Sequence, residues 1–311
     1  MRAPRRHPLS VLLASVGLGL LAGALLAGCG QGPGAGAAGG PLRVVAAEDF
    51  WGSIAQQLGG DRVQVTSIVT NPAADPHDYE PTSEDAKTMA LAQVSIVNGL
   101  GYDEWASRLL AASPDEGRVD LNVGDVVGLE AGDNPHQWYS PRSVHAAIGA
   151  IAAAYERALP RQAPYFERRR KAFEREGLAE YRRLIAGIRA RYAGTRVGAS
   201  ESIFEPLAEA LGLRLTTPAG FMDAISEGTE PPPSERAAVE AQLRERRVDL
   251  WVHNAQNATP DVDRLDEAAE AAGIPVATVT ETTTPEGARF QDWMVQELRG
   301  IEAALAGAKG G

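Results

Sequence analysis

The sequence predicts an α/β protein of two lobes, each with a mainly parallel sheet, joined by one long helix. Short β-branched runs alternate with helical patterns in residues 42–140 and again in residues 194–311. Such alternation is typical of parallel sheets covered by helices. Residues 141–193, between them, have helical periodicity and no strand signal. The 311 residues suffice for two domains of ordinary size.

Residues 1–28 are predicted to be a lipoprotein signal peptide. Three arginines at positions 2, 5 and 6 precede an apolar run, and Leu-Ala-Gly then stands directly before Cys29. This order is that of a secretory signal, and LAGC resembles the lipobox of bacterial lipoproteins, in which the cysteine is lipidated. The apolar run is nearly long enough for a transmembrane anchor instead. That alternative is less favoured, because the only cysteine of the chain stands here, followed by a Gly-rich tether over residues 29–41.

Charge and cysteine content narrow the function. Loss of the three arginines with the signal changes the net charge from −11 to −14. An acidic protein is a poor partner for nucleic acid, whose binding depends on basic surface. With Cys29 lipidated no thiol remains, which excludes disulfides, thiolate catalysis and cysteine-ligated metals. We therefore expect an extracytoplasmic protein held on the cell membrane by a lipid anchor.

The first lobe is predicted over residues 42–140. Its strands are expected at three places: 42–47, 63–69 and 94–98. Its helices are expected after them: 49–58, 82–92 and around 105–110. The second of these helices has a clear start, because Thr82 and Asp85 have the spacing of a capping box.

The middle of the chain, residues 141–193, is predicted to be helical throughout. Pro160 and Pro164 divide it into two stretches, and the second is dense in Arg and Glu at helical spacing. We expect this second stretch to be an exposed single helix of about 25 residues or more. It would join the two lobes once, as a strut.

The second lobe, residues 194–311, repeats the pattern of the first. Its strands are expected at 196–200, 248–253 and 274–280. Its helices are expected at 203–211, 232–247, 260–272 and 285–305. Both lobes are therefore predicted to be Rossmann-like, and in such sheets ligands bind beyond the carboxyl ends of the strands.

Polar side chains follow several of these strands. His77, in NPAADPHDYEPT, comes after the strand at 63–69, and His136 lies in DNPHQWYSP; each histidine follows a proline. In the second lobe, Glu201 and Glu281 each come directly after a strand. Imidazole and carboxylate are ligands for zinc, iron and manganese, and the prolines reduce the entropy lost when a cation orders the loops. The four residues together therefore predict a metal site.

Each residue taken alone has a plainer interpretation. A single histidine beside prolines is commonly a turn residue, and a glutamate at a helix start is stabilised by the helix dipole. His145 lies on a helical stretch and is expected at the surface. His253 ends a predicted strand and is kept as an outer contact or an alternative ligand. Three tryptophans are expected in the core: Trp51, Trp105 and Trp251.

Residues 71–105 (NPAADPHDYEPT through NGLGYDEW), with NPHQWYSP at 134–141, resemble the substrate-binding lipoproteins of bacterial ABC importers for zinc or manganese, the TroA-like or cluster A-I group. The resemblance covers the chain from about residue 42 to its end. It implies two α/β lobes joined by one rigid helix, with a metal between them. It also implies an ABC permease and ATPase as partners, and we expect a monomer.

Carried over to this chain, the resemblance implies four metal ligands: His77, His136, Glu201 and Glu281. The family more often has aspartate where Glu281 stands, and several members have histidine where Glu201 stands. The His-rich loop of many zinc-specific members is absent from this sequence. Two carboxylates favour manganese or iron relative to an all-imidazole site, while zinc outranks manganese at nearly any nitrogen–oxygen site. The sequence therefore favours zinc and leaves manganese open.

Two other functions were weighed against a receptor. A secreted metal-dependent hydrolase could use the same ligands, with Asp75 or Glu80 as general base. It would need an open coordination position, whereas four protein ligands close the site, and the His-Glu-x-x-His helix of common zinc proteases does not occur. A surface adhesin is the other, and the acidic composition offers it no support. We expect a receptor and not an enzyme.

Overall fold

The structure, a computed structural model, describes residues 40–71, 79–257 and 259–310. The predicted signal peptide, Cys29 and His77 lie outside the described residues. Residues Pro41–Gly311 form one compact unit. All helices and strands given below belong to this unit.

The first sheet has four parallel strands in the order β2-β1-β3-β4. The strands are β1 (Leu42–Glu48), β2 (Val63–Val69), β3 (Val94–Val97) and β4 (Val119–Asn122). The helices of this part are α1 (Asp49–Gly59), α2 (Ser83–Ala90), α3 (Glu104–Ala112) and α4 (Val123–Val127). The capping box at the start of α2 is confirmed: the Thr82 hydroxyl accepts from the Asp85 backbone N–H, and the Asp85 carboxylate accepts from the Thr82 N–H.

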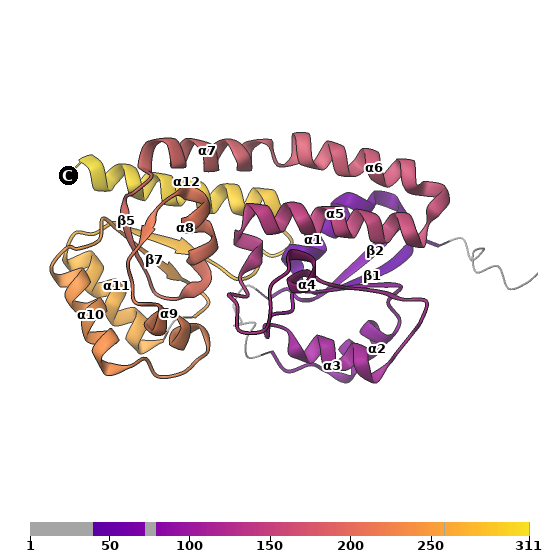
Figure 1. Cartoon of the computed structure of the whole chain (residues 1–311), viewed down its shortest axis with the longest axis horizontal. Coiled ribbons are helices and arrows are strands. Elements are labelled where there is room, and N and C mark those ends of the chain that lie inside the picture. Colours follow the sequence, from indigo (N-terminus) through magenta and orange to yellow (C-terminus); the bar gives the residue numbers. More distant parts are fainter. Residues whose placement is uncertain (1–39, 72–78, 258, 311) are drawn as a thin grey trace, which may run out of the picture. The chain divides into compact units, whose positions relative to one another are not determined.

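The second sheet repeats this arrangement, with four parallel strands in the order β6-β5-β7-β8 (Figure 1). The strands are β5 (Arg196–Ala199), β6 (Arg214–Leu215), β7 (Leu250–Asn254) and β8 (Val276–Val279). The helices are α8 (Glu205–Leu211), α9 (Ala219–Ser226), α10 (Pro233–Arg244), α11 (Pro260–Ala271) and α12 (Phe290–Gly310). The predicted α/β class with parallel sheets is confirmed.

The helical middle consists of α5 (Pro141–Ala158), a 3₁₀ turn (Pro160–Gln162), α6 (Ala163–Ala172), a π-helical turn (Phe173–Gly177) and α7 (Ala179–Tyr192). Helix α6 packs against α5 and α1, whereas α7 packs against α12 and α8 (Figure 1). The prediction of an exposed helix was wrong for one of its faces. Seven of its side chains are buried in the core: Phe166, Phe173, Leu178, Tyr181, Leu184, Ile188 and Tyr192.

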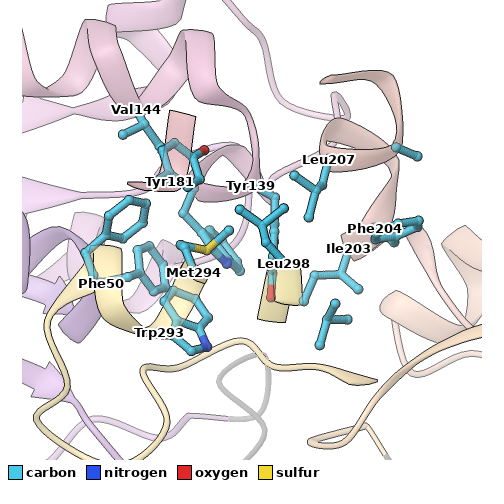
Figure 2. Close-up of a cluster of buried hydrophobic side chains, with 14 of the residues drawn as sticks. Phe50, Tyr139, Val144, Tyr181, Ile203, Phe204, Leu207, Trp293, Met294 and Leu298 are labelled. Carbon is cyan, nitrogen blue, oxygen red and sulfur yellow. The ribbon is translucent and has the colours of Figure 1, made fainter. Parts of the chain in front are cut away.

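The hydrophobic core is continuous between the two sheets. One cluster of buried side chains includes Phe50 of α1, Tyr181 of α7 and Trp293 of α12. Figure 2 shows these rings near Tyr139, with Ile203 and Leu207 of the second part close by. The lobes are therefore connected by packing as well as by the helix, and α12 contributes to that packing from the end of the chain. Trp51, Trp105 and Trp251 are buried, as predicted.

Three details of the fold differ from the prediction. The short strands β4 and β6 and the short helices α4 and α9 were not predicted. Helix α12 begins at Phe290 and not at residue 285. Residues 285–289 form a turn instead, in which Gly287 has a φ of 75° and the Ala288 N–H donates to the Pro285 carbonyl.

Candidate metal centre

Three of the four predicted ligands are fully buried, and two of these lie at strand ends. Glu201 follows β5, Glu281 follows β8, and His136 lies just before a 3₁₀ turn (Gln137–Tyr139) that leads into α5. Each of the three has 0% of its surface exposed. Burial of two glutamates and a histidine is costly without compensation, so their hydrogen bonds decide what this site can do.

The tautomer of His136 follows from its neighbour Asn134. The Asn134 side-chain NH₂ donates to the Ser202 carbonyl at 2.8 Å and to the Glu205 carboxylate at 2.9 Å. Both partners are acceptors, so the amide oxygen of Asn134 must face the His136 ring, where it lies 2.9 Å from Nδ1. Nδ1 is therefore the protonated nitrogen of the neutral ring, and Nε2 carries the lone pair that a metal requires.

The segment before His136 is held by β3. The Asn98 side chain at the end of that strand donates to the Pro135 carbonyl at 2.9 Å and accepts from the Trp51 indole at 3.0 Å. On its other side the His136 ring packs edge-on against Trp138, with centroids 5.3 Å apart. These contacts leave the imidazole little rotational freedom.

The two glutamates are oriented by carboxamides from the end of β7. The Asn257 NH₂ donates to Glu201 Oε2 at 2.8 Å, and the Asn254 NH₂ donates to Glu281 Oε1 at 2.7 Å. The Glu281 backbone N–H in turn donates to the Gln256 side chain at 2.6 Å. Neutral amide donors orient a carboxylate without cancelling its charge, which suits a cation ligand.

Tyr102 and Asn134 connect candidate ligands of the two lobes. The Tyr102 hydroxyl donates to Glu281 Oε2 at 2.8 Å, and its ring lies 6.2 Å from the His136 ring. Asn134 contacts His136 on one side and the carbonyl of Ser202, next to Glu201, on the other. His136 is thus linked through Asn134 to the residue next to Glu201, and through a ring contact with Tyr102 to Glu281.

The described residues contain three of the four predicted ligands. Within the described part of the chain, no group of three or more His, Cys, Asp or Glu side chains could hold a metal ion. His77 is not among the described residues, so the set of four ligands stays a prediction. The other two histidines are accounted for. His145 is exposed on α5, as predicted, and His253 is half-buried between Asp266 and Thr278.

The loop that carries Tyr102 has an unusual backbone. Gly99, Leu100 and Gly101 have φ values of 76°, 61° and 88°, a left-handed run that only glycine adopts easily. A Cβ at Gly99 would also lie 2.1 Å from Asn122 Oδ1. The Asp103 carboxylate stabilises the turn by accepting from the Asn98 and Gly99 N–H groups at 2.6 and 2.8 Å.

Behind this loop, Glu48 and Asp103 form a buried pair of acids. Burial and the neighbouring Asp103 carboxylate raise the pKa of Glu48 well above its usual value. Burial also raises the pKa of Asp103, although the Gly99 and Asn98 N–H groups oppose this. One proton shared by the pair satisfies both groups, since like charges this close cannot both ionise. This pair was not predicted from the sequence, because the strand was expected to end at residue 47 and Glu48 is its last residue.

Two further acids connect the lobes near the site. Asp49, at the start of α1, accepts from the Thr283 N–H at 3.1 Å and from its hydroxyl, and burial raises its pKa to about 6. Glu297 of α12 lies 2.5 Å from the Tyr139 hydroxyl and 3.0 Å from the Thr280 N–H. Burial raises the pKa of Glu297 to about 8, so this acid is mostly neutral at pH 7. Neither was predicted from the sequence, because both act through residues distant in the chain.

The carboxamides Asn254, Gln256 and Asn257 were also missed. The signal that could have found them is the run HNAQN (253–257), since three amides directly after a buried strand are unusual in a core position. Only His253 of this run was predicted to matter for the site. Asn254 is buried beside Glu281, whereas the ring of His253 contacts Asp266 and Thr278.

Two parallel sheets, with Glu201 and Glu281 beyond the carboxyl ends of strands in the second, are the arrangement of a two-lobed α/β binding protein. The family model described as zinc-uptake complex component A, periplasmic (ZnuA), matches residues 44–304. The chain therefore belongs to the ZnuA family. The resemblance noted in the sequence is thereby confirmed.

Several named proteins are similar to this chain. The metal ABC transporter substrate-binding lipoprotein FimA of Streptococcus parasanguinis is 26% identical over 274 residues, which cover 81% of this chain and 83% of that protein. The manganese ABC transporter substrate-binding lipoprotein PsaA of Streptococcus mitis is 24% identical over 91% of this chain and 95% of its own. The manganese-binding lipoprotein MntA of Halalkalibacterium halodurans is 33% identical over 41% of this chain and 43% of its own length.

Solved structures support the fold. A manganese-bound periplasmic metal-binding protein from Candidatus Liberibacter asiaticus (an S38A mutant) has a TM-score of 0.71 at 20% identity, covering 85% of this chain and 99% of its own. The binding protein FpvC of Pseudomonas aeruginosa, in complex with Ni²⁺, has a TM-score of 0.69 at 22% identity, covering 87% and 98%. Among the residues described here, no helix is both long and apolar enough to cross a bilayer.

Proposed function

We propose that this chain is the extracytoplasmic, lipid-anchored receptor of an ABC importer, which captures a divalent transition metal between its two lobes and delivers it to a membrane permease and its ATPase. The family and the named relatives support the receptor class. Nothing found supports the alternative of a metal-dependent hydrolase. The protein is expected to act as a monomer without nucleic acid.

One observation carries the proposal at the level of the site. His136, Glu201 and Glu281 are completely buried, and Tyr102 and Asn134 make hydrogen bonds between the two lobes beside them. A neutral imidazole with its lone pair on Nε2 and two carboxylates oriented by amides are the donors that a divalent cation needs. His77 is proposed as the fourth ligand on its place in DPHDYEPT.

The identity of the metal is proposed from the donor set. Two nitrogens and two carboxylates accept both zinc and manganese, and zinc binds nitrogen–oxygen sites more tightly in the intrinsic order. We therefore expect zinc to bind more tightly in purified protein. Relatives with manganese in their names keep manganese as the alternative cargo.

The test is the melting temperature of a soluble form that begins at Pro41, the compact unit, measured metal-free and with zinc, manganese or calcium. A ligand at about a thousand times its Kd stabilises the folded state by roughly 4 kcal/mol, which gives a shift of several degrees. Zinc and manganese should each raise the melting temperature, and His136→Ala should abolish the rise. Absence of any rise with both metals would overturn the proposal.

A further inference from the structure

Basic residues are concentrated in the helical middle of this acidic protein. Residues 141–193 contain 12 basic and 5 acidic residues, a net charge of +7. The rest of the chain after Cys29 contains 15 basic and 36 acidic residues, a net charge of −21. The metal site does not account for this separation of basic from acidic residues. A basic surface of this kind attracts a partner of negative charge.

Five exposed arginines recur at regular intervals from the 3₁₀ turn before α6 into α7. These five arginines stand at intervals of seven residues, and we call them the basic ridge: Arg161, Arg168, Arg175, Arg182 and Arg189. A heptad returns to nearly the same face of a helix, with a drift of about 20°, and the π-helical turn at Phe173–Gly177 adds a further rotation. All five side chains are nevertheless exposed.

Some charge on these helices is already neutralised. Ion pairs connect Arg170 to Glu167 and Glu174, and Arg175 to Glu176. Arg161, Arg168 and Arg182 differ, since within the described part of the chain they pair with no carboxylate, and Arg182 donates only to a backbone carbonyl, that of Arg175. These three arginines are available to an external anion.

The first strand, which follows the segment from Cys29, begins close to one end of the ridge. Leu42, where the segment from Cys29 enters the sheet, pairs with Val63. The adjacent Arg62 lies over the ring of Tyr165 in α6 at 5.5 Å, and the Tyr165 hydroxyl donates to Asp61 at 2.7 Å. The twelve peptide steps from Cys29 to Pro41 span at most about 40 Å, so a lipid on Cys29 would limit the distance of this end of α6 from the bilayer.

We propose that the basic ridge docks on the anionic phospholipid surface of the membrane that carries the lipid anchor. Each Lys or Arg near such a surface strengthens binding about fivefold, and tethering raises the local concentration of lipid headgroups. The negative charge of both lobes is repelled by the same surface, which orients the molecule with α6 and α7 toward lipid. The inference does not depend on the identity of the metal ligands.

The test uses the soluble form from Pro41 and sedimentation with vesicles. One set of vesicles is phosphatidylcholine alone, and the other contains one third phosphatidylglycerol. We expect binding to the anionic vesicles only, weakening as salt is raised. The triple variant Arg161→Gln, Arg168→Gln, Arg182→Gln should bind them at least about tenfold more weakly.

The matched control removes three exposed arginines outside the ridge, Arg108→Gln, Arg214→Gln and Arg244→Gln, and so changes the net charge equally. It should bind anionic vesicles nearly as well as the unchanged protein. Equal losses in both triples would mean that only net charge matters, and failure of the unchanged protein to bind would also overturn the proposal. An unchanged metal-induced shift of melting temperature in the ridge triple verifies that it is folded.

Discussion

The two lobes hold their candidate ligands by different chemistry. In the first lobe, His136 is positioned by Asn134, by a carbonyl contact from Asn98 and by the ring of Trp138. In the second lobe, Glu201 and Glu281 are positioned by carboxamides that all come from the end of one strand, β7. The first lobe offers a rigid, neutral nitrogen donor, whereas the second offers buried negative charge.

Because of this difference, neither lobe alone supplies the full set of candidate metal ligands. An imidazole alone binds a divalent cation weakly, and buried carboxylates are costly without a cation or strong hydrogen bonds. Tyr102 and Asn134 each connect the two kinds of ligand across the lobes. Metal binding should therefore depend on both ligand sets and on these two bridges.

The largest effect is expected from removing the nitrogen donor. His136→Ala should weaken zinc binding by more than about 100-fold. Loss of a residue that only hydrogen-bonds to a metal ligand already lowers metal affinity by about 10–100-fold, and His136 is itself a proposed ligand. His145→Ala is the matched control, since His145 is an exposed histidine on α5. Isothermal titration of zinc into both variants makes the measurement, and equal affinities for the two would refute the assignment of His136.

The next largest effect is expected from removing a carboxylate charge in the second lobe. Glu281→Gln should weaken binding by roughly 10–100-fold, because it removes a negative charge and presents an NH₂ group to the donors Asn254 and Tyr102. Glu286→Gln is the control, an exposed glutamate five residues away. Competition of each variant with a zinc-chelating dye reports the affinity. An unchanged affinity for Glu281→Gln would place the fourth ligand elsewhere.

A smaller loss is expected from the amides behind the ligands. Asn257→Ala leaves Glu201 in place and removes its oriented donor, so binding should weaken by about tenfold. Asn134→Ala removes both the His136 contact and the bridge to Ser202, and its loss should be larger. If Asn257→Ala costs more than Asn134→Ala, the bridges matter less than the orientation of the carboxylates.

The smallest effect on metal binding is expected from substitution of Glu297. This substitution should instead change how the free energy of unfolding depends on pH. A folded pKa of about 8, above the usual 4.5, means that the folded state binds the proton more tightly than the unfolded state. The contribution of this group to stability is therefore fully present below pH 4.5 and falls as pH rises toward 8. Glu297→Gln should remove this fall, by up to a few kcal/mol.

The reason lies in the hydrogen bonds of Glu297. The Tyr139 hydroxyl contacts both Glu297 Oε2 and the Thr280 carbonyl, at 2.5 and 2.9 Å. One hydroxyl proton serves one acceptor, so a neutral carboxyl supplies the second proton, as a glutamine NH₂ would. Urea unfolding of both proteins from pH 5 to 9 is the measurement. Parallel pH profiles would mean that Glu297 is ionised in the folded protein.

Much of the fold could be predicted from the sequence. Hydrophobic runs of strand length, alternating with helical periodicity, predicted the two parallel sheets because burial imposes these two periods on the residues. The positions of Glu201 and Glu281 directly after strands followed from the same pattern. The helical middle was predicted as well, but its buried face was not, because its many Arg and Glu residues concealed the spacing of Phe166, Phe173 and Tyr181.

By itself, then, the sequence determined the two α/β halves, the helix between them and the candidate ligand types, since these depend on local periodicity and on motifs. Only the tertiary structure decided that Asn134 sets the tautomer of His136, that Tyr102 joins Glu281 from the other lobe, and that Glu297 links Tyr139 to Thr280. Each of these contacts requires folding to bring together segments that no local pattern relates. Their strength comes from burial, which the chain acquires only when both lobes are packed.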